Sequence, residues 1–296
     1  MEEENKNWYD KSYKLLLIIP AVLLIFCLVY LYGFVQDSGD IIKKDVTLTG
    51  GTSISVFTKD FDIKNVENSL KTEFPDLKIR EINDFRSGKT IGFFIETKAD
   101  AEPIKNALEK YLGYELNQEN SSIEFTGETI SSGFYKQMRN AIIIAFVLMS
   151  LVVFLVFRTF VPSLAVILSA FADIVMTITL VDILGMEVSI AGIIAFLMLI
   201  GYSVDTDILL TSRLIKRNEG SVNERIWGAF KTGMTMTLTS IAAVAVSLFI
   251  IYNFSETLRQ IFTILLIGLG FDIFNTWITN ASILKLYVER KGEGYK

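Results

Sequence analysis

The chain has 296 residues, of which 51% are hydrophobic, and its mean hydropathy is +0.43, which favours a membrane protein over a soluble one. The net charge of −5 argues against a nucleic-acid-binding role, because phosphate contacts require a basic surface. The absence of histidine and the single cysteine, Cys27, exclude His-based triads, thiolate zinc sites and an intramolecular disulfide, so we expect neither a metal nor a cofactor.

Six apolar stretches are long enough to cross the hydrocarbon core of a membrane, which takes about 20 residues. The first, Leu15–Val35, lies in the N-terminal segment 1–35. It is too long for the core of a signal peptide, so we expect it to remain as an anchor. The other five form a predicted bundle over residues 140–286, with helices at about 140–159, 162–184, 188–211, 233–252 and 260–286.

The distribution of lysine and arginine predicts the orientation of the spans, because cytoplasmic connections are enriched in these residues. Thirteen basic residues lie at the termini and in two of the connections: Lys6, Lys11, Lys14, Arg158, Arg213, Lys216, Arg217, Arg225, Lys231, Lys285, Arg290, Lys291 and Lys296. The two short connections on the other side contain only Arg259. We therefore expect a multi-pass protein of the cytoplasmic membrane, with both termini and the tail 287–296 in the cytoplasm.

Residues 36–139 are expected outside the membrane as a folded domain, since periodic elements alternate there with turn residues. The expected elements are strand Val46–Thr58, helix Asp62–Phe74, strands Leu77–Ile82 and Thr90–Thr97 in a hairpin around Asp84–Lys89, helix Asp100–Leu112 and strand Ser122–Phe125. The order β-α-β-β-α-β is that of a ferredoxin-like sandwich. The predicted fold class is an α-helical membrane protein of six transmembrane helices, with an external ferredoxin-like α+β domain between the first two.

Aspartates interrupt the third and fourth spans, where an ionisable residue costs at least about 2.5 kcal/mol and is therefore a functional candidate. Asp173 lies at the midpoint of the third span. Asp205 and Asp207 are roughly 200° apart around the fourth helix, so they cannot share a face. Helical spacing aligns Asp173 with Ser169 and Thr177, Asp207 with Ser203 and Thr211, and Asp205 with Gly201 and Tyr202.

Polar stripes also mark the last two spans. One stripe consists of Lys231, Thr232, Thr235 and Thr239, and the other of Asp272, Asn275, Thr276, Thr279 and Asn280. Together the stripes imply a polar interior shared between helices. A structural interpretation stays open beside the functional one, because Ser and Thr often bond their own backbone and residues near helix ends, such as Asp207 and Lys231, can extend to the interface. Asp173 is too deep to do so, which leaves function or a buried structural contact.

Three motifs carry a resemblance to a known family. Gly50-Gly51-Thr52, at the end of the run from Asp45, is similar to the core of that family's strand after the first span. Gly201-Tyr202-Ser203-Val204, followed by acidic and polar residues and then Arg213, resembles its fourth-span signature, and Asp173 stands where it carries an acidic residue. The family is SecF, the smaller partner in the SecDF protein-export complex of the resistance-nodulation-division superfamily, and the resemblance extends along the whole chain.

The chain departs from bacterial SecF sequences in ways that suggest an archaeal-type member. Asp205-Thr206-Asp207 stands where bacterial members usually have Asn-Asp-Thr, and Asp205 lies where the SecD partner has its aspartate. Lys231-Thr232 replaces a common Arg-Thr pair, and Asp272 has no counterpart that we can place.

The resemblance implies an accessory subunit of the protein translocon that uses the proton-motive force to assist export. A single six-span unit implies a SecD-like subunit, because two such units pack together in this superfamily. The other implied partners are the Sec translocon channel, the translocating polypeptide and membrane lipid. Because histidine is absent, the proton-coupling candidates are Asp173, Asp205, Asp207 and Asp272, with Lys231 as a charged partner. The polar stripes supply Thr177, Tyr202, Ser203, Thr235, Thr239 and Thr276 as supporting residues.

Two other functions stay open. One is a proton-uncoupled scaffold of the translocon whose aspartates only hold helices together, and the other is a small-molecule or lipid exporter of the same superfamily. An enzyme is not expected, since no Gly-x-x-x-x-Gly-Lys loop for phosphate binding is present. The coupling ion, H⁺ or Na⁺, is not determined by the sequence.

Overall fold

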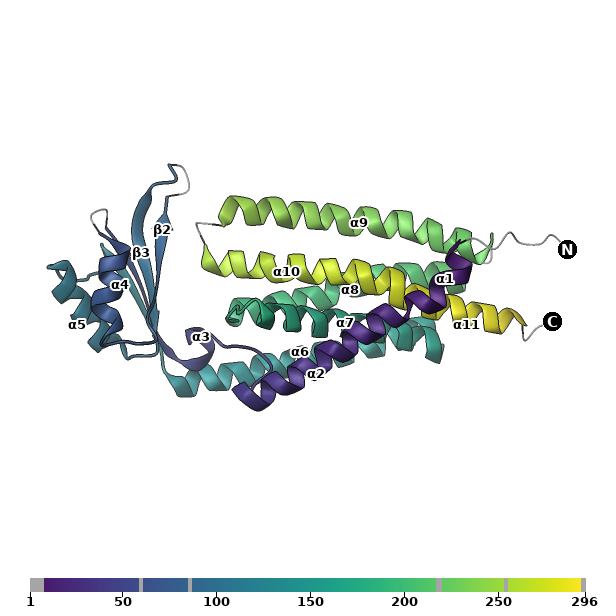
Figure 1. The fold of residues 1–296 in the computed structure, drawn as a ribbon, viewed down its shortest axis with the longest axis horizontal. Coiled ribbons are helices and arrows are strands. Elements are labelled where there is room, and N and C mark those ends of the chain that lie inside the picture. Colours follow the sequence, from purple (N-terminus) through teal and green to yellow (C-terminus); the bar gives the residue numbers. More distant parts are fainter. Residues whose placement is uncertain (1–7, 59–60, 85–86, 217–219, 253–254, 294–296) are drawn as a thin grey trace.

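The computed structural model describes residues 8–58, 61–84, 87–216, 220–252 and 255–293 (Figure 1). Lys6, Arg217 and Lys296, three of the basic residues used to predict orientation, lie outside these ranges. The elements are, in chain order, α1 (Trp8–Leu16), α2 (Ile18–Ser38), α3 (Val46–Thr49), β1 (Gly51–Phe57), α4 (Ile63–Lys71), β2 (Lys78–Asn83), β3 (Thr90–Thr97), α5 (Ala101–Leu112), β4 (Ser121–Thr126), α6 (Glu128–Phe157), α7 (Phe160–Ile183), α8 (Ile190–Lys216), α9 (Val222–Ile251), α10 (Glu256–Phe274), the π-helix η1 (Asn275–Asn280) and α11 (Ala281–Glu293).

A small antiparallel sheet with two helices, here called the sheet domain (residues 51–126), lies at one end of the molecule (Figure 1). Its strand order is β2-β3-β1-β4, so β1 and β3 are central. Side chains alternate between the two faces of a strand. Ile54, Phe93 and Ile95 accordingly pack on one face against Val66 of α4 and Ile104 of α5. The opposite face is left for polar residues, and it looks toward the helical bundle.

The segment before β1 differs from the predicted strand Val46–Thr58, because residues 46–49 form the helical turn α3. Asp45 caps this turn by accepting hydrogen bonds from the Thr47 N–H (2.9 Å) and the Thr47 hydroxyl (2.6 Å). Such local side-chain bonds compete with strand pairing, and alternation of apolar and polar residues alone cannot reveal them. The turn ends at Gly50, so the strand begins only at Gly51.

Six helices of the described residues are long and apolar enough to cross a membrane, as the sequence predicts. They are Ser12–Ser38, Glu128–Phe157, Phe160–Ile183, Ile190–Lys216, Val222–Ile251 and Glu256–Lys291. Two helices begin earlier than expected. α6 begins at Glu128 rather than at about residue 140, because it continues directly from the sheet domain. α9 begins at Val222 rather than at about residue 233, because Ser221 forms a capping box there. The helices pack side by side, and both described chain ends lie opposite the sheet domain (Figure 1).

The helices differ greatly in how much of their surface is buried. In the most apolar 18-residue stretch of each helix, 61% of the residues are buried in α7 and 56% in α8. The corresponding share is 6% in α9 and 11% in both α6 and the N-terminal span. The span formed by α10, η1 and α11 is intermediate at 44%. The centre of the bundle is therefore built from α7, α8 and the last span.

Candidate functional site

Three aspartates lie in the centre of the bundle, one on each of its three most buried spans. Asp173 comes from α7, Asp207 from α8 and Asp272 from α10, and each is 0% exposed. We call them, with the polar side chains that contact them, the carboxylate cluster. The sequence predicts all three as candidates, and the structure brings them into one region, where the charge of Asp272 acts on the other two.

Asp173 is held by one side chain from each neighbouring span. The Ser203 hydroxyl of α8 donates to Asp173 Oδ2, and the Asn275 amide of η1 donates to Oδ1 at 2.7 Å. Thr177, predicted as a supporting residue, donates at 2.6 Å to the backbone carbonyl of Asp173 rather than to its carboxylate. Both carboxylate oxygens of Asp173 are thus satisfied by neutral donors.

Asp272 is bound by two hydroxyls. Thr206 Oγ1 lies 3.0 Å from Asp272 Oδ1 and 3.2 Å from Oδ2, and Thr276 Oγ1 lies 3.2 Å from Oδ1. Asp207 accepts a hydrogen bond from the Asn280 amide at 2.7 Å. The donors that reach the cluster within the described part of the chain are therefore hydroxyl and amide groups, each of which stabilises a buried carboxylate less than a paired cation does.

A π-helical segment presents the amides to the cluster. η1 covers Asn275–Asn280 in the middle of the last span, where the sequence predicts one regular helix over 260–286. Residues five apart are about 140° apart on an α-helix, whereas i→i+5 bonding in a π-helix brings them closer together. Asn275 and Asn280, five residues apart, both point into the bundle and are 0% exposed.

Two of the predicted coupling residues lie outside the cluster. Asp205 is exposed, as are Gly201 and Tyr202, which confirms that Asp205 and Asp207 face different ways. Lys231 is exposed as well, and its ammonium group lies 5.4 Å from the centre of the Trp227 ring. In the conformation described, Lys231 therefore lies on the outer face of α9 and away from the buried aspartates.

The polar stripe of α9 also faces outward. Thr235 and Thr239 are exposed and donate to backbone carbonyls one turn earlier, each at 2.8 Å, to Lys231 and Thr235 respectively. Helical alignment predicted the stripe but not which way it points, since that depends on the packing of the other helices. Arg213, of the fourth-span motif, donates to Thr232 at 2.9 Å and so ties α8 to α9.

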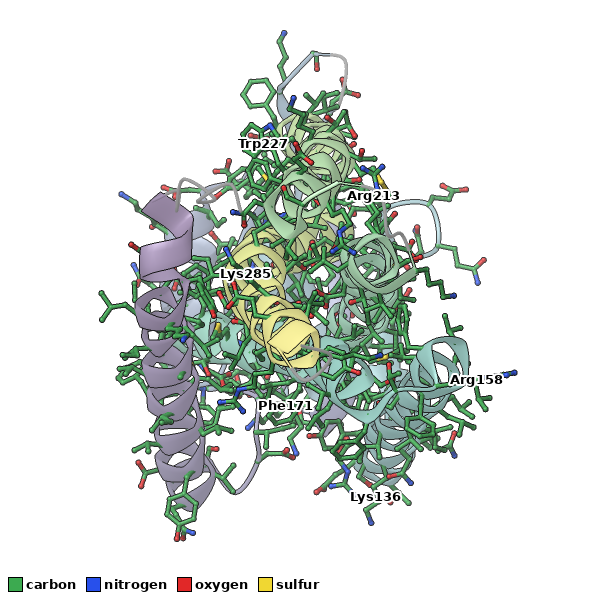
Figure 2. The ribbon with its side chains drawn as sticks, turned by 90° about the vertical axis from the view of Figure 1, so that its right-hand side faces the viewer. Lys136, Arg158, Phe171, Arg213, Trp227 and Lys285 are labelled. Atoms are coloured by element: carbon green, nitrogen blue, oxygen red, sulfur yellow. The ribbon has the colours of Figure 1, made fainter. Side chains whose placement is uncertain are left out.

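Figure 2, which views the bundle from the end opposite the sheet domain, shows Lys285 on the last span inside this end, while Arg158 points away from the bundle. Lys285 is 1% exposed, donates to Asn223 at 2.7 Å and lies 5.0 Å from the centre of the Tyr13 ring. The sequence suggests only a basic residue at the membrane edge here. Its burial links the N-terminal helix to the last span.

The Gly50-Gly51-Thr52 motif lies where the sheet domain meets α6. A Cβ on Gly50, whose φ is 93°, would lie 2.6 Å from the Glu128 Cα. A Cβ on Gly51 would clash with the backbone carbonyl oxygen of Thr97. Thr52 donates to the Ala99 carbonyl at 2.7 Å. The motif therefore permits a close crossing of backbones and holds the domain to the start of α6.

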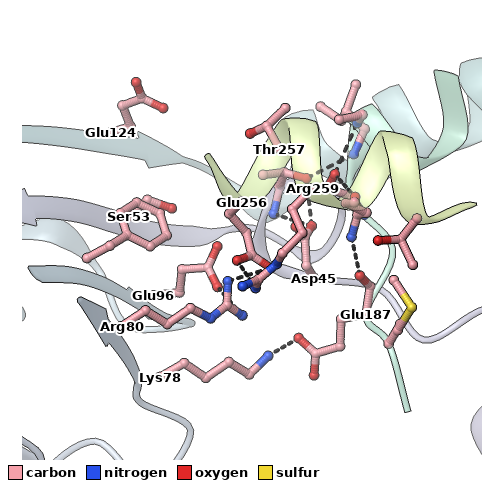
Figure 3. A pocket seen from close by; sticks show the side chains of 18 of the residues that line it. Asp45, Ser53, Lys78, Arg80, Glu96, Glu124, Glu187, Glu256, Thr257 and Arg259 are labelled. Atoms are coloured by element: carbon pink, nitrogen blue, oxygen red, sulfur yellow. Dashed lines mark hydrogen bonds and ion pairs between the residues drawn. The ribbon is translucent and has the colours of Figure 1, made fainter. Parts of the chain in front are cut away.

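A cavity of about 970 Å³ separates the polar face of the sheet from the bundle (Figure 3). Charged side chains bridge it: Lys78 of β2 pairs with Glu187, Lys43 also pairs with Glu187 at 3.1 Å, and Arg80 pairs with Glu256 at 2.8 Å. Burial raises the pKa of the Glu96 carboxyl in this cavity above its usual value, although the neighbouring Arg80 opposes the shift. Desolvation lowers the pKa of Lys78.

Several of these residues were not among the predicted site residues. Asn275, Asn280 and Thr206 bind the aspartates directly, and the signal that could have singled them out is their place in polar stripes beside an aspartate. The charged residues of the cavity carry no such signal, because Lys78 and Glu187 are 109 residues apart and look like ordinary surface charges.

Comparison with known proteins adds a second line of evidence. Residues 105–290 match the family model described as protein export membrane protein SecD/SecF, C-terminal. A protein-export membrane protein SecF from Methanolacinia petrolearia is 37% identical over 95% of both chains, and one from Methanocaldococcus jannaschii is 39% identical over 94% of this chain and 96% of its own.

Solved structures agree in fold. The crystal structure of SecDF from Thermus thermophilus, described as a translocon-associated membrane protein, has a TM-score of 0.74 at 17% identity. It matches 98% of this chain, which spans 40% of the SecDF chain. A SecDF structure in a super-membrane-facing form has a TM-score of 0.59 at 17% identity.

Proposed function

This chain belongs to the SecF family of protein-export membrane proteins, and from that premise we propose that it is one half of a SecDF complex whose carboxylate cluster couples ion movement to export. The observation that carries the proposal is the meeting of three fully buried aspartates on three different spans. Ionisable groups at this depth are costly and typically mark ion or proton pathways. A change in their charge would alter the packing of α7 against α8 and the last span.

The need for a partner is supported by the outward face of α8. Asp205 lies there with Gly201 and Tyr202, on a strip of helix flanked by α6 and α9, which both pack against α8. A carboxylate facing lipid is unfavourable, and a glycine beside it allows a neighbouring helix to approach closely. We propose that a SecD-like subunit covers this face and supplies the donors that Asp205 needs.

The proposed setting is the cytoplasmic membrane. Basic residues at the helix ends opposite the sheet domain, among them Arg158, Arg213 and Lys285, favour a cytoplasmic position for that end and for both termini. The sheet domain, whose antiparallel strand order supports a ferredoxin-like assignment, then lies outside. There it meets the translocating polypeptide and the Sec translocon channel, while the exposed apolar helices contact lipid. We propose no catalytic activity.

The proposed coupling mechanism is a switch between two packings. Protonation of Asp173 or Asp272 from the outer side would remove a buried charge and weaken the mutual repulsion of the aspartates. The hydroxyl and amide donors of α8 and η1 would then change partners, and the spans would shift. α6 continues from the sheet domain into the membrane after Gly127 and would carry the shift outward.

The experiment is reconstitution of the chain with its SecD-like subunit and the channel in vesicles with an imposed proton gradient. We expect Asp173→Asn, which keeps the side-chain volume but cannot ionise, to assemble normally and to reduce both proton flux and gradient-dependent export at least tenfold. Asp37→Asn, which changes an exposed carboxylate at the end of α2 outside the cluster, is the control and should behave as the parent. If Asp173→Asn transports protons and exports protein as well as the parent, the scaffold function is correct instead.

A further inference from the structure

A second cavity, of about 600 Å³, lies between the sheet domain and the start of α6. Its walls come from α3, α6, the end of β4 and the segment between β3 and α5, and Figure 1 shows α3 beside α6 at this place. Helical spacing puts Ser132, Tyr135, Lys136 and Arg139 on the one face of α6 that lines the cavity. The proposed coupling makes no use of this site.

The cavity is lined by four cations and three carboxylates. The cations are Lys44, Lys98, Lys136 and Arg139, and the carboxylates are Asp40, Asp100 and Glu128. Lys44 and Asp40 neutralise each other at 3.0 Å, and the Tyr135 hydroxyl also donates to Asp40. The other three cations form no ion pair or side-chain hydrogen bond with any described residue. They are therefore available to an anion that enters the cavity.

The cavity lies at the depth of the lipid headgroups. α6 has 30 residues and ends at Phe157, whereas about 20 residues cross the hydrocarbon core. Counted back from Phe157, the core begins near Met138, so Lys136 and Arg139 lie on either side of its boundary. Basic pockets beside membrane-spanning helices at this level are typical binding sites for lipid headgroups.

The surface of α6 that continues from the cavity into the membrane is apolar. Ile143 and Val147 are exposed, and they lie seven and eleven residues after Lys136, on the same face of the helix. Figure 2 shows Lys136 at the outer edge of the bundle. A lipid whose headgroup enters the cavity can therefore lay its acyl chains along α6.

The charges of the site select the kind of lipid. The lining has a net charge of +1, which balances the single negative charge of a phosphodiester, and cations bond phosphate oxygens strongly. The positive end of the α6 dipole also favours an anion, since Gly127 supplies no side-chain cap. Asp100 and Glu128 form no side-chain hydrogen bond with any described residue, so they can accept hydrogen bonds from headgroup hydroxyls.

We propose that this cavity binds an anionic phospholipid with a hydroxylated headgroup, such as phosphatidylglycerol, with the phosphate between Lys136 and Arg139. The test is native mass spectrometry of the full chain in detergent, titrated with short-chain lipids. We expect one phosphatidylglycerol to bind at least tenfold more tightly than phosphatidylcholine, whose headgroup has no net charge.

The double variant Lys136→Gln with Arg139→Gln should lose this preference. Arg158→Gln with Lys231→Gln, which removes two exposed cations from the opposite end of the bundle, is the matched control and should keep it. A second double variant, Lys136→Arg with Arg139→Lys, keeps both charges and should bind the lipid as the parent does. The thermal unfolding midpoint without added lipid checks that each variant is folded.

Phosphatidylmethanol has the same charge as phosphatidylglycerol and no headgroup hydroxyl, so it should bind several-fold more weakly. Equal affinity for these two lipids would overturn the role given to Asp100 and Glu128. Equal affinity for phosphatidylcholine, an unchanged preference in Lys136→Gln with Arg139→Gln, or an equal loss in the control would overturn the site. Displacement of the lipid by an equal concentration of inorganic phosphate would show instead that the cavity takes a soluble phosphate.

Discussion

Among the described residues, asparagine, threonine and serine rather than lysine or arginine bond the buried aspartates. A neutral donor lets a carboxylate keep its position whether or not it is ionised, whereas a cation would hold it charged. The aspartates themselves could be predicted, because charges in apolar spans stand out. Ser203 and Thr276 could be predicted as well, since they lie in polar stripes. The convergence of Asn275 and Asn280 could not, because it depends on the π turn, which leaves no mark in the periodicity.

We expect Gly50→Ala to destabilise the protein more than an ordinary substitution of a glycine with positive φ. The backbone angles of Gly50, φ 93° and ψ 152°, lie near a region that essentially only glycine adopts, and another residue there costs about 1–3 kcal/mol. At Gly50 the new Cβ would also lie 2.6 Å from the Glu128 Cα, and overpacking adds typically about 1–3 kcal/mol. Gly88→Ala, at φ +64° with nothing within 4 Å, is the control for a glycine with positive φ and no steric contact. Denaturant unfolding of the full chain measures both, and equal losses would show that the crossing at α6 tolerates a methyl group.

Individual elements connect the sheet domain to the bundle in two ways. One is the direct passage from β4 through Gly127 into α6. The other is the set of charges on β2 that reach across the cavity to Glu187 and Glu256 (Figure 3). The strands and helices of the domain were predictable from periodicity and turn residues. The cavity was not, since it arises from contacts between segments far apart in the chain.

The pH dependence of stability tests the charged lining of this cavity. The pKa of Glu96 is raised by burial, so the folded protein binds this proton more tightly than the unfolded chain does. Ionised Glu96 therefore lowers stability, and the effect grows as pH rises from the usual Glu value of about 4.3 through the folded pKa. We expect Glu96→Gln to raise the thermal unfolding midpoint at pH 7, with a difference that disappears near pH 4.

Glu124→Gln is the matched control, because Glu124 lines the same cavity but is exposed on an edge strand. Its midpoint should equal that of the parent at every pH. A lower midpoint for Glu96→Gln at pH 7 would mean instead that the contact with Arg80, at 3.8 Å, outweighs the cost of burial.

The whole molecule has a buried polar centre and an unusually exposed periphery. Only 6% of the residues in the most apolar stretch of α9 are buried, and the polar stripe of α9 faces outward, as Asp205 does on α8. Six spans could be predicted from hydropathy, and the direction each stripe faces could not. A single subunit with charge and threonine on its outer surface is best explained as half of a larger assembly.

Accessibility of Tyr202 tests this view. In a Cys27→Ala background, a cysteine placed by Tyr202→Cys should react readily with a membrane-permeable maleimide in the isolated chain, since the tyrosine is 46% exposed. We expect labelling to fall at least tenfold when the SecD-like subunit is bound. Val22→Cys on α2, also exposed at 59%, is the control. Equal labelling of Tyr202→Cys in both states would place the partner on another face.

The short contact between Lys44 and Val188 bears on the order in which the protein assembles. These residues form a β-bridge that joins the segment before the sheet domain to the connection between α7 and α8. At ~5–20 residues per second, a ribosome takes roughly 7 to 30 s to reach Val188 after Lys44. The sheet domain can therefore complete its own core well before the bundle exists to receive it, and its docking is a late step of biogenesis that waits for the connection after the third span.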